Sequence, residues 1–190
     1  MEIEEIKLKV CLLGDEGVGK TCLIRQFVYQ EYDEAYKKTI GTTVVKRDVE
    51  LVDEGYRANM MILDIMGRMD YFNSIRDRYL KNVKGVIAVF DLTRLKTLTS
   101  LGEWLSEITS QDGSVSTLVL ANKADLLEET KVSDADIERF CSGLSCSWLK
   151  TSAKTGENVE KAFRILAKQM FWSALRSHGL FNVGPPAGGK

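Results

Sequence analysis

The sequence lacks the features that build metal centres and membrane spans. It contains one histidine, His178, and four cysteines without a C-x-x-C pair, so we expect no zinc site. No apolar run reaches 18 residues, which predicts no transmembrane helix, and the acidic start Met1–Glu5 does not resemble a signal peptide. With 26 lysine and arginine against 27 aspartate and glutamate residues, the charge favours neither nucleic acid nor an anionic membrane as a partner. We therefore expect a reduced, cytoplasmic setting.

What the sequence does contain is enough for one globular domain with a hydrophobic core. Of its 190 residues, 44% are hydrophobic and 28% are charged, which is typical of globular domains. Short apolar runs alternate with segments of helical periodicity, and this alternation predicts an α/β fold. The expected strands are 6–13, 43–51, 57–64, 85–91, 115–121 and 147–151, and the expected helices are 20–29, 70–82, 97–111, 133–142 and 157–177.

Residues 14–21 match the phosphate-binding P-loop pattern G-x-x-x-x-G-K-[ST]. An apolar strand pattern precedes the loop and a helical pattern follows it, which is the context that the motif requires. The glycines let successive backbone N–H groups converge on an anion, and the start of the helix favours negative charge. We expect Lys20 to reach the β- and γ-phosphates of a nucleotide and the Thr21 hydroxyl to face Mg²⁺.

The expected fold is the three-layer α/β sandwich of P-loop NTPases. Two continuous apolar runs, 86–90 and 117–121, are typical of parallel strands buried on both faces. A turn signal at 53–55 lies between two strand patterns and predicts one antiparallel edge strand. The sheet should therefore have about six strands, mostly parallel, with about five helices, one of them opened by a capping box at Ser133–Asp136. We expect a domain over residues 1–177 and a flexible tail over 178–190.

Two motifs at strand ends indicate a guanine base. Asp125 of Asn122-Lys-Ala-Asp125 can accept two N–H bonds from guanine N1 and N2, whereas adenine offers no matching pair and would leave the carboxylate unpaired. We expect the Lys123 stem to lie over the base and Asn122 to tie its loop to the P-loop. In Thr151-Ser-Ala-Lys154, the Ala153 N–H is placed to meet guanine O6 and Lys154 to cover the other face of the base. Taken alone, these segments also fit ordinary capping or strand-to-helix turns.

A third motif, Asp64-Ile-Met-Gly67, fits the pattern D-x-x-G at the end of an apolar strand. Asp64 is expected to hold Mg²⁺ through water, and the Gly67 N–H to meet the γ-phosphate. By itself the pattern is common and also fits an ordinary strand end. Its position after the P-loop is what favours the functional interpretation.

Taken together, the four motifs and their spacing resemble the Ras superfamily of small GTPases, with Rab-like members closest, over about residues 6–172. The resemblance implies a GTP/GDP switch that uses Mg²⁺, with a first switch over 36–41 and a second over 66–76. It implies metal ligands at Thr21, Thr39 and, through water, Asp64, and catalytic roles for Lys20, Thr39, Gly67 and the residue at position 68. The nucleotide-binding residues that it implies are Glu16, Gly17, Val18, Gly19, Lys20, Thr21, Cys22, Tyr32, Tyr36, Thr39, Gly67, Asn122, Lys123, Asp125, Ser152, Ala153 and Lys154.

Two residues depart from the family pattern beside the expected γ-phosphate. Position 68 is Arg68, where the family usually has a glutamine that orients the attacking water; arginine has donors only and cannot hold a water as glutamine does. Position 16 is Glu16, a carboxylate where relatives carry glycine or serine. We expect slow intrinsic GTP hydrolysis. The two side chains either interact across the nucleotide, with Arg68 as an internal finger, or are simply solvated on their loops.

The expected partners are effector and regulator proteins that contact residues 36–48 and 66–76. These segments differ from the Rab pattern, which usually continues I-G-V-D-F where this chain has Ile40-Gly-Thr-Thr-Val44, so the identity of the partners does not carry over. No cysteine lies beyond Cys146 and residue 2 is glutamate, so we expect no lipid anchor, as in prokaryotic members of the superfamily, archaeal ones among them. We expect a monomer.

The last helical segment is unusually apolar toward its end, with Phe171, Trp172, Leu175, Leu180 and Phe181. These residues either make a partner or weak membrane contact or pack back onto the domain. For the whole chain, two functions other than a hydrolysing switch remain open. One is a hydrolysis-deficient GTP-binding module or scaffold in signalling or trafficking. The other is a different P-loop enzyme such as a nucleotide kinase, against which the Asn122–Asp125 motif argues.

Overall fold

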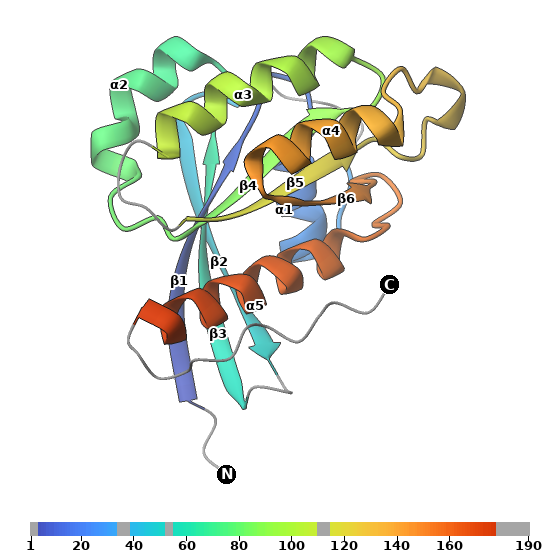
Figure 1. Cartoon of the computed structure of the whole chain (residues 1–190). Helices are drawn as coiled ribbons and strands as arrows, with labels where there is room; N and C mark the ends of the chain where they lie inside the picture. The colour runs from blue at the N-terminus through green and yellow to red at the C-terminus, as the bar shows by residue number, and fades with distance from the viewer. Residues whose placement is uncertain (1–3, 34–38, 52–54, 110–114, 178–190) are drawn as a thin grey trace.

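The protein is a three-layer sandwich around one six-stranded sheet (Figure 1). The computed structural model describes residues 4–33, 39–51, 55–109 and 115–177. The sheet has the strand order β2-β3-β1-β4-β5-β6, in which only the β2–β3 pair is antiparallel, so the predicted fold and its antiparallel edge strand are confirmed. The strands are β1 (Glu4–Leu13), β2 (Thr42–Leu51), β3 (Tyr56–Ile65), β4 (Gly85–Asp91), β5 (Ser116–Asn122) and β6 (Ser147–Thr151).

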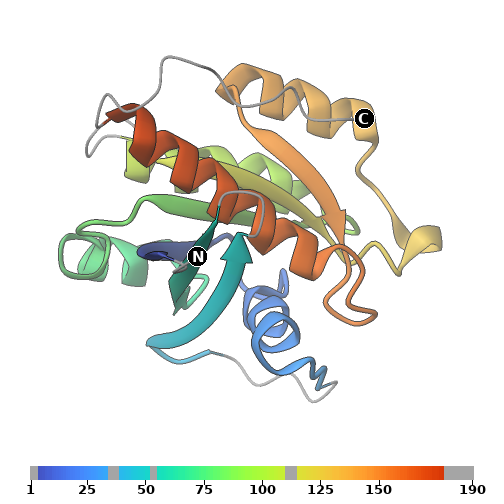
Figure 2. The same ribbon diagram turned by 90° about the horizontal axis from the view of Figure 1, so that it is seen from below.

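Helices cover both faces of the sheet. The helices are α1 (Lys20–Tyr29), α2 (Met69–Tyr79), α3 (Leu95–Thr109), α4 (Asp134–Leu144) and α5 (Val159–Ser177), with a short 3-10 helix η2 (Leu127–Glu129). One core lies between the sheet and helices α1 and α5, and Figure 2 looks onto this face. A second core lies between the sheet and helices α2, α3 and α4.

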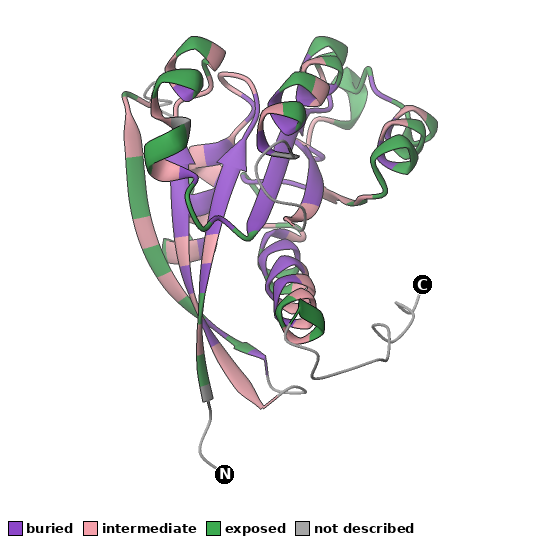
Figure 3. Ribbon diagram, turned by 60° about the vertical axis from the view of Figure 1, so that its left-hand side comes forward, coloured by how far each residue is buried: buried purple, intermediate pink, exposed green. Residues whose placement is uncertain are grey.

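The central strands supply both cores, which explains their continuous apolar sequences. In β1, Val10 and Leu12 belong to the first core while Cys11 and Leu13 belong to the second, and all four are fully buried. Every residue of β4 is buried as well, as the purple strands in Figure 3 show. Burying apolar surface on both faces of the strands is the main source of stability for such a sheet.

The strand register brings the ends of the strands to one edge. Leu12 of β1 pairs with Asp64 of β3, Asp91 of β4 pairs with Asn122 of β5, and Asn122 pairs with Thr151 of β6. Because β1, β3, β4, β5 and β6 run parallel, the loops that follow them emerge together. The predicted motifs, far apart in the sequence, therefore share one edge of the sheet.

Several helix ends differ from the predicted ones, for local reasons. Helix α2 ends at Tyr79 and not at residue 82, because the chain turns at Asn82, which takes a left-handed conformation with φ 65°. Helix α5 begins at Val159 and not at 157, after a turn in which Asn158 has φ 56°. Ser133 lies outside α4 as its N-cap, and the predicted capping box with Asp136 is present. Residues 110–111 of the predicted third helix and the predicted turn residues 53–54 lie outside the described residues.

The end of α5 packs back onto the domain. Phe171 is buried, and its ring contacts Tyr56 and Trp172 with centroids 4.7 and 5.4 Å apart. Trp172 and Leu175 pack against the first core. The packing alternative therefore holds for these residues, whereas Leu180, Phe181 and the predicted tail 178–190 lie outside the described residues. Over the described part of the chain, the structure contains no helix with the length and apolarity needed to cross a bilayer.

Candidate functional site

The P-loop connects β1 to α1, and its backbone lies directly against the side chain of Asn122 in the Asn122–Asp125 motif. Gly19 has φ 101°, and a Cβ there would lie 2.3 Å from Asn122 Nδ2, so only glycine fits. The same Nδ2 donates to the Val18 carbonyl at 2.8 Å. The predicted link from Asn122 to the P-loop is therefore present.

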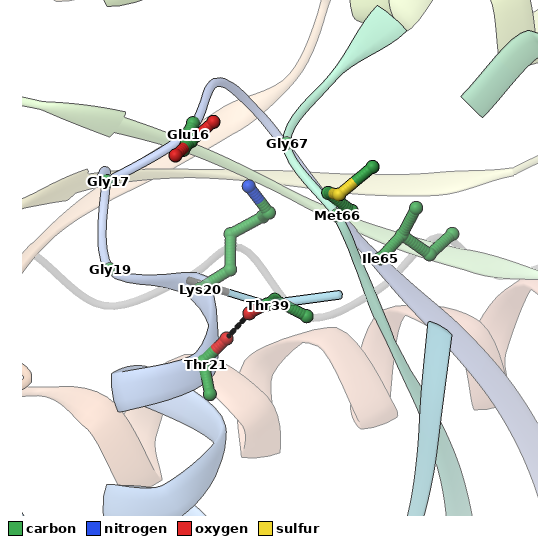
Figure 4. A pocket seen from close by; sticks show the side chains of 9 residues that line it. All are labelled: Glu16, Gly17, Gly19, Lys20, Thr21, Thr39, Ile65, Met66 and Gly67. Atoms are coloured by element: carbon green, nitrogen blue, oxygen red, sulfur yellow. Dashed lines mark hydrogen bonds between the residues drawn. The ribbon is translucent and has the colours of Figure 1, made fainter. Parts of the chain in front are cut away.

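Lys20 lies almost fully buried under the P-loop (Figure 4). Its ammonium donates to the carbonyls of Gly14 at 2.6 Å and Asp15 at 2.9 Å. Burial lowers the pKa of Lys20 to about 8, although Asp64 and Asp15 oppose the shift. The loop thus holds a positive charge in a poorly solvated place, where it interacts strongly with an incoming anion.

Three predicted metal ligands meet beside Lys20. The hydroxyls of Thr21 and Thr39 are 2.7 Å apart, and Thr21 Oγ1 donates to Asp64 Oδ2 at 2.7 Å. Asp64 is buried, and its Oδ1 has no hydrogen-bond partner. Burial raises the pKa of Asp64, while the Thr21 hydrogen bond and Lys20 lower it. Two hydroxyls and a carboxylate with an unsatisfied oxygen form an all-oxygen donor set that fits Mg²⁺.

Gly67 lies directly against the P-loop. A Cβ at Gly67 would lie 2.5 Å from the Glu16 nitrogen and 2.6 Å from Lys20 Nζ. This close approach explains why the position is glycine. The hollow between the P-loop, Thr39 and Gly67 measures about 10 Å³, about the space of one water molecule or ion.

A larger cavity of about 360 Å³ adjoins the P-loop on the side of the guanine-type motifs. Its wall brings together most of the predicted base-binding residues from four separate segments, one of which contributes Tyr32 and Asp33. The size suits a nucleobase and sugar. The lining residues are Gly17, Gly19, Cys22, Tyr32, Asp33, Asn122, Lys123, Asp125, Leu126, Ala153 and Lys154.

Within this cavity the side chains are oriented by one another. Ser152 donates to Asp125 Oδ1 at 2.6 Å, which fixes the carboxylate that we expect to read guanine. The Ala153 N–H, which we expect to meet guanine O6, donates in this structure to Asn122 Oδ1 at 3.2 Å. Lys123, which also lines the cavity, has φ 69°, and its ammonium lies 2.7 Å from Asp91 Oδ2.

Arg68 is held by a neighbour on its own segment. Its Nε and Nη2 donate to the two carboxylate oxygens of Asp70 at 3.2 and 2.6 Å, and half of the side chain is exposed. These bonds raise the pKa of Arg68 and lower that of Asp70. Glu16 lines the small hollow beside Gly67. Tyr36, the other predicted phosphate-side residue, lies outside the described residues.

The sequence alone did not identify a set of residues that fix the P-loop from the other side. Asp15 accepts hydrogen bonds from Trp104 Nε1 at 2.9 Å and Ser100 Oγ at 2.6 Å, both on α3. Arg94 donates to the Glu16 carbonyl at 3.2 Å. These contacts span 78 to 89 residues of sequence, so no local pattern signals them.

Asp91, at the end of β4, is the buried anchor of this region. It is fully buried and accepts from the N–H and hydroxyl of Thr93, from Arg94 and from Lys123. Burial raises the pKa of Asp91, but the bonds from Lys123, Thr93 and Arg94 outweigh it and leave the pKa below its usual value. Asp91 stands in the sequence at the carboxyl end of an apolar strand, which did not indicate these partners.

Comparison with known proteins agrees with this geometry. A model of the Ras family matches residues 9–171. The chain is also 34% identical over 191 residues to Ras-related protein Rab-30 of Homo sapiens, Bos taurus and Mus musculus, and these alignments cover 100% of this chain and 93% of each relative. Both the family match and the full-length similarity span every strand-end motif described above. The chain therefore belongs to the Ras family of small GTPases, which implies a GTP-binding switch that hydrolyses GTP.

Proposed function

We propose that this small GTPase binds GTP and GDP with Mg²⁺ at the strand-end site and hydrolyses GTP slowly when no other protein assists it. The observation that carries the slow rate is Arg68, which takes the position of the water-orienting glutamine and is paired with Asp70. The proposed domain spans residues 1–177.

The proposed nucleotide site uses three loops. The P-loop backbone and Lys20 bind the phosphates, since Lys20 is already buried beneath the loop that would surround them. Asp125 reads the guanine edge, and its bond from Ser152 supports a fixed orientation. Lys123 and Lys154 both line the cavity and would cover the base. GTP binding would order the first switch around Thr39 and the second around Gly67.

Mg²⁺ would be held by Thr21 and Thr39, with Asp64 acting through water. When bound, the ion neutralises phosphate charge and orients the phosphate oxygens. The chain's own contribution is the donor set that is in place, with the hydroxyls of Thr21 and Thr39 2.7 Å apart and Asp64 behind them. Thr39 thereby couples the first switch to the P-loop helix.

The slow rate follows from what Arg68 offers to a water molecule. A water that attacks phosphorus needs an acceptor for its proton and a group to orient it, and a guanidinium supplies only donors. Two of those donors bind Asp70, and freeing them would still supply no acceptor for that proton. Glu16 places a further carboxylate beside the small hollow, where it repels a phosphate of like charge.

Single-turnover GTP cleavage by purified protein tests the proposal. Arg68→Gln should cleave GTP about tenfold faster, the effect of one transition-state hydrogen bond of ~1.4 kcal/mol, while Arg68→Ala should stay at the low rate. An unmodified protein as fast as its Arg68→Gln variant would contradict the proposal. A protein with no measurable cleavage, purified with GTP still bound, would favour the hydrolysis-deficient module.

The proposed partner surface comprises residues 36–48 and 66–76. Ile40 is 89% exposed and Val44 is 45% exposed, next to Thr39. Large exposed apolar side chains beside a nucleotide-sensing residue suit effector or regulator proteins that distinguish the two states. A pull-down with protein loaded with GDP or with a non-hydrolysable GTP analogue tests this; binding that is equal in both states, or unchanged by Ile40→Ser, would contradict it.

A further inference from the structure

Arg94 lies between the P-loop and the start of α3, and its guanidinium contacts two acceptors. Nε donates to Asp91 Oδ2 at 2.8 Å, and Nη2 donates to the carbonyl of Glu16 at 3.2 Å. A Cβ at Gly17 would lie 3.6 Å from the same guanidinium. The arginine therefore rests against the peptide that joins Glu16 to Gly17.

The carbonyl and the N–H of this peptide face different partners. Its carbonyl belongs to Glu16 and accepts from Arg94, while its N–H belongs to Gly17, which lines both the small hollow and the larger cavity. Because a trans peptide is planar, fixing the carbonyl toward Arg94 also fixes the N–H on the opposite side. A cationic donor on the carbonyl polarises the peptide and strengthens the N–H as a donor.

Arg94 is itself fixed. Asp91 is fully buried and also accepts from Thr93 and Lys123, so the carboxylate that holds Arg94 has no freedom to move away. The chain of contacts from Glu16 through Arg94 and Asp91 to Lys123 connects the phosphate loop to the base-binding loop. A lysine in place of Arg94 has one nitrogen and lacks the planar fork that contacts both acceptors.

We propose that Arg94 is a positioning residue for nucleotide binding. It holds and polarises the Glu16–Gly17 peptide so that the Gly17 N–H is a strong donor to a nucleotide phosphate. Through Asp91, it also links the P-loop to the base-binding loop. The proposal rests on the proposed GTP and GDP site and adds a residue to it that touches no part of the nucleotide. Loss of Arg94 should therefore lower the affinity for nucleotide, although no residue that contacts the nucleotide is removed.

The test compares Arg94→Ala with a matched control, Arg164→Ala. Arg164 is exposed to the same degree as Arg94, 45% against 44%, and it also joins a carboxylate, Glu160, to a backbone carbonyl, that of Glu50. Dissociation of a fluorescent GDP analogue should be about tenfold faster in Arg94→Ala, since the P-loop loses the charge-assisted hydrogen bond to the Glu16 carbonyl. Arg164→Ala should dissociate like the unmodified protein.

A second readout separates polarisation from a general loosening of the fold. In the GDP complex, the amide proton resonance of Gly17 should move upfield in Arg94→Ala and stay in place in Arg164→Ala. Arg94→Lys, which keeps the charge and the pair with Asp91, should melt like the unmodified protein but release GDP as Arg94→Ala does. Unchanged dissociation or an unchanged Gly17 resonance in Arg94→Ala would overturn the proposal, whereas an unmodified protein that binds no GDP would overturn the proposed function instead.

Discussion

Arg68 and Asp70 form a two-point ion pair at the start of α2, with Arg68 Nη2 2.6 Å from Asp70 Oδ2. Both side chains are more than half exposed. The residue that departs most from the family pattern, which directly precedes α2, therefore has its partner in the first turn of that helix. Of the two sequence-based alternatives, this arrangement is closer to solvated side chains than to an internal finger reaching across the nucleotide.

The ion pair leads to a prediction about the cleavage rate of an Asp70→Ala variant. If Arg68 takes no part in cleavage, Asp70→Ala frees the guanidinium without consequence, and single-turnover GTP cleavage keeps the rate of the unmodified protein. An exposed pair contributes little to folding, so the melting temperature should hardly change either. Faster cleavage in Asp70→Ala that disappears in the Arg68→Ala, Asp70→Ala double variant would reverse this conclusion, because it would show an arginine finger restrained by Asp70.

The lowered pKa of Lys20 predicts that the protein takes up protons when it binds nucleotide. Its pKa of about 8 in the nucleotide-free protein reflects burial, and phosphates beside it favour the charged form. At pH 8 nucleotide binding should therefore take up about half a proton. Calorimetric titration with GDP in two buffers of different ionisation enthalpy measures this uptake directly.

The control for proton uptake is Lys20→Arg, whose guanidinium stays charged at every accessible pH. Any binding by this variant should show no uptake at pH 8. The sign also sets the pH dependence of folding: a lysine with a lowered pKa is destabilising while charged, so the nucleotide-free protein should gain stability as the pH rises from about 8 toward 10.5. Zero uptake in the unmodified protein would mean that Lys20 is neutral in both states or charged in both.

Much of the site could be predicted because its motifs are local and each ends a strand. The P-loop at 14–21, Asp64, Asn122 and Thr151 each follow an apolar run, and parallel strands bring such ends to one edge. The link from Asn122 to Val18 follows from the same geometry. Helix α4 was also marked by its capping box, whose chemistry is complete within four residues.

The remainder depended on contacts that no local pattern encodes. Arg94 contacts Glu16 across 78 residues and Trp104 contacts Asp15 across 89 residues, and both pairs require α3, which begins directly after Arg94, to lie beside the P-loop. The end of α2 and the start of α5 were placed wrongly because Asn82 and Asn158 take left-handed conformations, which asparagine tolerates but does not impose. The sequence also did not show that Arg68 pairs with Asp70 two residues away.

The raised pKa of Asp64 predicts that its charge destabilises the metal-free protein. Its pKa lies above the usual value because burial disfavours the carboxylate, even with Thr21 and Lys20 opposing the shift. A group with a raised pKa stabilises the fold when protonated and loses that contribution as the pH rises through its folded-state pKa, so at pH 7 the charge is a net cost. Asp64→Asn should therefore raise the melting temperature of metal-free protein by roughly 3 °C, the shift expected for about 1 kcal/mol.

In the Asp64→Asn variant, Mg²⁺ should raise the melting temperature of the GDP complex much less than in the unmodified protein. Melting curves with GDP, in Mg²⁺ or in chelator, should separate clearly for the unmodified protein and much less for Asp64→Asn. Thr43→Ser, on the edge strand opposite Asp64 in the β2–β3 register, is a control that leaves the donor set intact. An Asp64→Asn protein that melts lower without metal, or that gains as much from Mg²⁺ as the unmodified protein, would contradict the assignment.

Asp15 and Trp104 make a prediction about how firmly α3 holds the P-loop. Trp104→Phe removes the indole N–H that Asp15 accepts but keeps an aromatic ring to meet Phe72, which it contacts edge-on at 5.3 Å between ring centroids. Leaving a part-buried carboxylate oxygen without this donor should lower the free energy of unfolding by about 1–2 kcal/mol. Urea denaturation at saturating GDP measures the change.

A double-mutant cycle with Asp15→Ala isolates the contact from the loss of ring volume. Since the two side chains touch, Asp15→Ala and Trp104→Phe together should cost less than the sum of the single changes, by about 1 kcal/mol. Trp148→Phe, which removes the same atoms at another position of the second core, should add to Asp15→Ala without coupling. Additive effects for Asp15 and Trp104 would mean that this hydrogen bond contributes nothing to stability, and that Ser100 and Arg94 fix the P-loop from the side of α3.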